Sequence, residues 1–108
     1  MNFDINEVLF QMAGAIKANV AENWEEVKNP TNAFLQSRKE RLALLADLLI
    51  RKEISQARFD SRMEDEKLIT EAQLHAIAVI SKAIAQKAAN AAIDIFQKAV
   101  KAALNVAI

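Results

Sequence analysis

The sequence predicts an all-α fold, and three observations lead to this prediction. The 108-residue chain contains one Gly and one Pro, whereas a sheet protein needs turn residues at short intervals. Hydrophobic residues make up 53% of the chain, enough for a folded core. Apolar residues also recur at helical spacing. We therefore expect one domain over residues 1–108, an antiparallel helical hairpin or bundle of three helices at about 5–27, 30–52 and 56–108.

The first predicted helix covers residues 5–27. Asp4 precedes it and suits the N-cap position, because its carboxylate can accept hydrogen bonds from the first backbone N–H groups. Gly14 lies mid-helix, where it weakens the helix by about 1 kcal/mol relative to Ala, and a close helix crossing is one reason for a Gly there. The apolar residues form one stripe at helical spacing: Ile5, Val8, Leu9, Met12, Ile16, Val20, Trp24 and Val27.

The second predicted helix covers residues 30–52 and follows the only strong break in the chain, at 28–32. Pro30 disfavours helix at Asn29 and suits the first turn of a new helix. Residues 42–50 are apolar nearly all round, which is typical of a helix that lies between other helices. The first helix either folds back onto the second or continues in line with it, and we favour the fold-back only slightly.

The third predicted helix covers residues 56–108 and is rich in alanine. Ser55 suits its N-cap, and Ile54 with Phe59 has the spacing of a hydrophobic staple. Residues 53–55 then form a short link, which makes the neighbouring helices antiparallel. The alternative is one unbroken helix through this point. The third helix is on the order of 75 Å long at 1.5 Å per residue.

Residues 72–108 are the predicted assembly segment, because they carry apolar residues on two faces. One face follows an eleven-residue repeat, which favours nearly straight packing. A helix end that is apolar on two sides needs cover on two sides, and three helices of this length can hardly supply both. The alternative is that the first face only lines the chain's own core. We expect an interface formed by Ile84, Ala88, Ala91, Ile93, Ile95, Phe96, Ala99, Val100 and Leu104.

The sequence predicts a non-enzymatic structural or interaction protein, a homo-oligomer or the partner of another helical protein. The chain has no cysteine, and its single Gly excludes a Gly-rich phosphate loop, so we expect no catalytic residue, cofactor or metal site. Fourteen basic and 14 acidic residues cancel, which argues against nucleic-acid binding. The N-terminus has no signal-peptide pattern, so the cytoplasm is the default location, with signal-less secretion or particle assembly as alternatives.

A membrane-active or pore-forming function is the first alternative. Residues 72–108 combine an apolar face with four lysines, a pattern compatible with a helix at a membrane interface. The lysines are Lys82, Lys87, Lys98 and Lys101.

A metal–carboxylate protein is the second alternative. Glu71 lies one turn before His75, the only histidine, so both can share a helix face. Di-iron bundles use a different spacing, i to i+3, and draw further ligands from other helices. An exposed or structurally bonded histidine is therefore the more probable role for His75.

Overall fold

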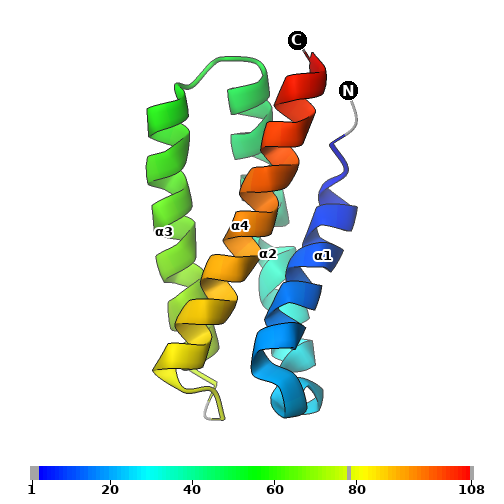
Figure 1. Ribbon diagram of the computed structural model, residues 1–108, viewed down its shortest axis with the longest axis vertical. Coiled ribbons are helices and arrows are strands. Elements are labelled where there is room, and N and C mark those ends of the chain that lie inside the picture. Colours follow the sequence, from blue (N-terminus) through cyan, green and yellow to red (C-terminus); the bar gives the residue numbers. More distant parts are fainter. Residues whose placement is uncertain (1–2, 78, 108) are drawn as a thin grey trace.

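The computed structural model describes residues 3–77 and 79–107, with side chains as far as residue 105. The described residues form α1 (Ile5–Val20), a short 3-10 turn η1 (Ala21–Asn23), α2 (Trp24–Ile50), α3 (Gln56–His75) and α4 (Lys82–Ala107). Successive helices run in opposite directions, so α1 begins and α4 ends at the same end of the bundle (Figure 1). The predicted all-α bundle is confirmed, whereas the predicted position of the first turn and the predicted continuity of the third helix are wrong.

The first turn lies at Ala21–Asn23 and not at the predicted residues 28–32. Ala21 has φ 51° and ψ −116°, a conformation in which glycine is usual. Because alanine occupies this position, no glycine marks the turn in the sequence. Pro30 lies inside α2 at an exposed position. The backbone hydrogen bond that Pro30 cannot donate is therefore on a side of the helix that water reaches. The chain folds back at this turn, as favoured, and α1 packs against α2.

The start of α1 agrees with the sequence, but the reason suggested for Gly14 does not. Asp4 Oδ1 accepts hydrogen bonds from the backbone N–H groups of Asn6 (3.0 Å) and Glu7 (3.3 Å). This confirms Asp4 as the N-cap. Gly14 is exposed, and a Cβ added there would meet no neighbouring atom within 4 Å. No close helix crossing requires a glycine at this position.

The second turn is confirmed. Ser55 Oγ accepts a hydrogen bond from the Arg58 backbone N–H at 3.1 Å and caps α3, so the unbroken-helix alternative is wrong. At the end of α2, Lys52 has φ 62°. The backbone N–H of Lys52 donates to the Leu49 carbonyl (2.9 Å), and that of Glu53 donates to the Leu48 carbonyl (2.8 Å). These two bonds form a Schellman motif, which satisfies the last carbonyls of the helix.

The predicted helix 56–108 is wrong, because α3 ends at His75 and α4 begins at Lys82. Ser81 Oγ accepts a hydrogen bond from the Ile84 backbone N–H at 3.2 Å, which is N-cap geometry. The preceding Ile80 is buried. The apolar face that follows the eleven-residue repeat is therefore interrupted by this break and is not continuous. The break folds α4 back along α3 instead of extending it into solvent.

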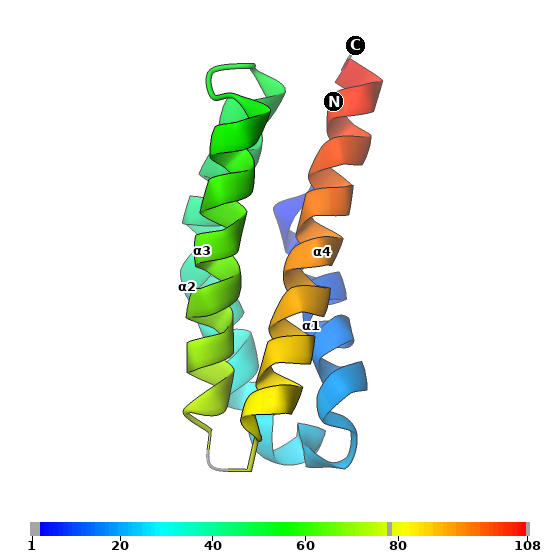
Figure 2. The same cartoon turned by 60° about the vertical axis from the view of Figure 1, so that its left-hand side comes forward.

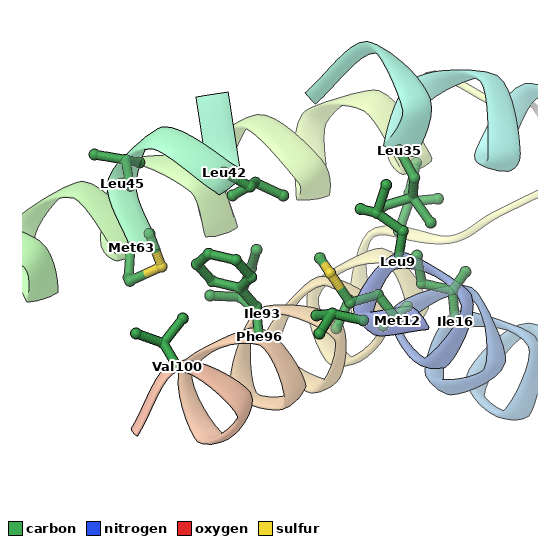
Figure 3. Close-up of a cluster of buried hydrophobic side chains, with 14 of the residues drawn as sticks. Leu9, Met12, Ile16, Leu35, Leu42, Leu45, Met63, Ile93, Phe96 and Val100 are labelled. Carbon is green, nitrogen blue, oxygen red and sulfur yellow. The ribbon is translucent and has the colours of Figure 1, made fainter. Parts of the chain in front are cut away.

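The four helices enclose one continuous apolar core. α4 packs most extensively on α1 and then on α3, whereas α2 and α3 pack together less closely. In the view of Figure 2, α3 lies in front of α2 and α4 lies in front of α1. Small side chains on α4 explain the close contact, because Ala85, Ala88 and Ala92 are fully buried and interaxial distance depends on the side chains between helices. Figure 3 shows side chains from all four helices pointing toward one another, including Met12, Leu42, Met63 and Phe96.

Candidate functional site

Four of the nine predicted interface residues lie in the chain's own core. Ala88, Ile93, Phe96 and Val100 are each at most 1% exposed. Their placement corrects the expectation that another chain must cover this face. That expectation assumed three helices, whereas the break between α3 and α4 lets α1 and α3 cover α4 from two sides.

Phe96 lies at an aromatic contact that joins three parts of the chain. Its ring centroid is 5.9 Å from that of Phe3 in an edge-on arrangement and 6.3 Å from that of Phe59 in a stacked one. Both arrangements are favourable for aromatic rings. The residue chosen as the centre of an interface is therefore a centre of the fold.

The other five predicted interface residues are half-buried. Packing within the chain accounts for part of this burial, because Ile84, Ile95 and Ala99 contact the buried core. Ala91 and Leu104 are also half-buried. Among the described side chains, these residues therefore leave no continuous exposed apolar stripe along α4, and their place in an interface stays a prediction.

The structure does not gather a set of metal ligands around His75. The His75 side chain is exposed at the end of α3, and Glu71 is half-buried one turn earlier. No group of three His, Cys, Asp or Glu residues with metal-binding geometry occurs within residues 3–77 and 79–107. In the same part of the chain, no helix is both long enough and apolar enough to cross a bilayer.

A buried carboxylate connects α2 with α3. The Glu66 side chain is 2% exposed, and Arg38 binds it with both Nη2 (2.5 Å to Oε2) and Nε (3.1 Å to Oε1). Arg41 Nε lies 3.3 Å from Oε2. Such a forked pair is geometrically specific, so it fixes how α2 and α3 lie against each other. The sequence analysis did not pair these residues, because nothing in the sequence shows that they meet across two helices.

The largest exposed apolar side chain described in the structure is Phe10 on α1, which is 79% exposed. It borders a pocket of about 310 Å³ between α1 and α2, whose floor includes Leu9 and Leu35. We name its rim the α1–α2 face, defined by Asn6, Phe10, Ala13, Asn32 and Gln36. The sequence analysis did not select Phe10, although an aromatic residue off the apolar stripe of an amphipathic helix is a usable signal.

These features define an up-and-down four-helix bundle with a well-filled core and an uncharged surface pocket beside an exposed aromatic residue. No family model, curated protein or solved structure matches the chain. Functional inference therefore depends on the surface of the bundle itself.

Proposed function

We propose that this chain is a non-enzymatic interaction protein that forms a symmetric homodimer through the α1–α2 face. The exposure of Phe10 is the observation that carries the proposal. An aromatic side chain left in water next to a pocket is typical of an interface anchor. The proposal keeps the predicted interaction function and moves the surface from α4 to the opposite side of α1.

The α1–α2 face is suited to a second copy of itself. In a two-fold dimer the same surface meets itself, so a surface charge would meet a like charge unless it were offset from the axis. No charged residue lines this pocket. Asn6, Asn32 and Gln36 carry amides, each of which both donates and accepts hydrogen bonds, so identical surfaces can pair. Each copy also offers an aromatic side chain and a pocket, so a two-fold pairing can place the Phe10 ring of one copy at the pocket of the other.

The first test is mass in solution across a wide concentration range, by light scattering coupled to size exclusion. We expect the wild type to shift from monomer to dimer as concentration rises. Phe10→Ser should weaken dimerisation about 30-fold or more, because an interface anchor contributes at least about 2 kcal/mol. Its fold should be unaffected, because Phe10 contributes little to the core of the monomer.

Leu44→Ser provides the matched control. Leu44 is 55% exposed on α2 and does not line the α1–α2 pocket. The Leu44→Ser variant should dimerise like the wild type. A wild type that stays monomeric at millimolar concentration would contradict self-association. A dimer that Phe10→Ser leaves intact would move the interface to another surface, and the half-buried residues of α4 would be examined next.

A further inference from the structure

A second pocket lies between α3 and α4, at the end of the bundle where α2 ends and α3 begins. Its volume is about 420 Å³, within the range of about 300 to 1,000 Å³ that is usual for small-molecule sites. Three helices supply its lining, and it does not share residues with the α1–α2 face. The argument for this pocket is therefore independent of the proposed dimer.

The pocket has an apolar floor and a polar rim. Leu49, Phe59, Val100 and Leu104 form the apolar part, one from α2, one from α3 and two from α4. The rim consists of three amide side chains and two lysines: Gln56, Gln97, Asn105, Lys98 and Lys101. A pocket that combines apolar side chains with polar groups can hold both parts of an amphipathic ligand.

The charges at the rim are all positive. No Asp or Glu lines the pocket. Lys98 forms an ion pair with Asp94 on its own helix at 3.0 Å. Lys101 takes part in none of the ion pairs formed by the described residues. Lysine can extend its amine into water while its carbon chain covers apolar surface, so Lys101 is able to meet an anion at the mouth.

We propose that this pocket binds a single-chain amphiphile with an anionic head, such as a fatty acid in its monomeric form. The hydrocarbon chain lies against Leu104, the least buried of the four apolar residues, and the anionic head lies at Lys101 within reach of the rim amides. Asp60 accepts a hydrogen bond from the rim residue Gln56 at 2.9 Å, and Asp94 pairs with Lys98, so Lys101 is the cation that supplies the preference for an anionic head over a neutral or cationic one. The limited volume selects one chain over a two-chain lipid.

The test uses the full-length protein and decanoate as the probe, below its micelle concentration, followed by titration calorimetry and amide chemical shifts. We expect saturable binding, with shifts at Leu49, Phe59 and Leu104 and none at Phe10. Lys101→Glu should weaken binding about tenfold, because an exposed ion pair contributes up to about 1 kcal/mol and the reversal replaces attraction by repulsion. Decanol, which has the same chain and no charge, should bind more weakly than decanoate.

Lys87→Glu is the matched control, because Lys87 is exposed on the same helix and does not line the pocket. It should bind decanoate like the wild type. Circular dichroism checks that both variants are folded. Equal weakening by both variants would overturn the proposal, because it would show general charge attraction. Absence of binding by monomeric decanoate, or binding only to micelles or to anionic vesicles, would overturn it as well.

Discussion

Lys52 holds a backbone conformation that suits glycine better than lysine. Its φ of 62° costs an L-residue about 1 kcal/mol, because Cβ approaches the following carbonyl. We expect Lys52→Gly to raise the free energy of unfolding by about 1 kcal/mol, measured by urea denaturation. Lys87→Gly is the control of opposite sign, since Lys87 is exposed inside α4 and a Gly there should cost about 1 kcal/mol. A loss of stability in Lys52→Gly would contradict the strained backbone conformation described for Lys52.

Among the polar side chains that the structure describes, Glu66 is the one whose replacement should lower the free energy of unfolding most. Replacing Glu66 with Gln leaves Arg38 and Arg41 without a counter-charge. Breaking a fully buried ion pair costs about 3 to 5 kcal/mol. Both arginines keep contact with water, so we expect about 2 kcal/mol.

Glu64→Gln tests whether the effect comes from burial. The Glu64 side chain is 69% exposed, and its ion pair with Lys67 should contribute under about 1 kcal/mol. Thermal unfolding of both variants gives the comparison. Similar small losses in the two variants would show that Glu66 has no special role.

Helix starts are marked by the same local pattern at both of the later turns. Ile54-Ser55 precedes α3, Ile80-Ser81 precedes α4, and each serine accepts a backbone hydrogen bond three residues later. The first pair was recognised from the sequence, whereas the second was missed. The residues that follow Ser81 are strong helix formers, and no Gly or Pro interrupts them. A capping pattern inside a strongly helical stretch therefore has to be compared with the alternative of one longer, unbroken helix.

The Ser81 cap should be needed for the full stability of α4. We expect Ser81→Ala to lower the free energy of unfolding by about 1 kcal/mol, because the Ile84 backbone N–H loses its partner. Ser61→Ala is the control, since Ser61 is exposed inside α3 and alanine favours helix there. Urea denaturation measures both. A Ser81→Ala variant as stable as the wild type would mean that packing of Ile80 alone positions the turn.

Proline and glycine, the usual turn signals, do not mark the turn between α1 and α2. Pro30 usually marks a helix start, yet it lies within α2, and the turn forms at Ala21 without a glycine. Val20 and Val27, on either side of the turn, are both buried. The chain therefore reverses at a position that lets both side chains reach the core. Local propensity is a weak preference that tertiary packing often overrides.

At the scale of the whole molecule, the core makes one strong prediction. Phe96→Glu places a charge where the side chain is 0% exposed, and burying an unpaired charge costs as much as most of a small domain's stability. We expect loss of cooperative unfolding and of most helical signal in circular dichroism. An interface residue would instead give folded monomers.

Phe10→Glu is the control for this substitution, because the same change is made at a position that is 79% exposed. At concentrations where the wild type is monomeric, Phe10→Glu should remain folded with a melting temperature close to that of the wild type. If Phe96→Glu stays fully folded, the core described around Phe3 and Phe59 is wrong.

The sequence by itself determined the helical class, the caps at Asp4 and Ser55, and the apolar stripe of α1. These features depend on composition and on contacts between residues a few positions apart, which the order of residues encodes directly. Only the tertiary structure decided the turn at Ala21, the break between α3 and α4, the burial of Phe96, the pairing of Glu66 with two arginines and the exposure of Phe10. These depend on which helices meet, because a long alanine-rich helix and a folded-back pair have the same local preferences, and burial of apolar surface selects between them.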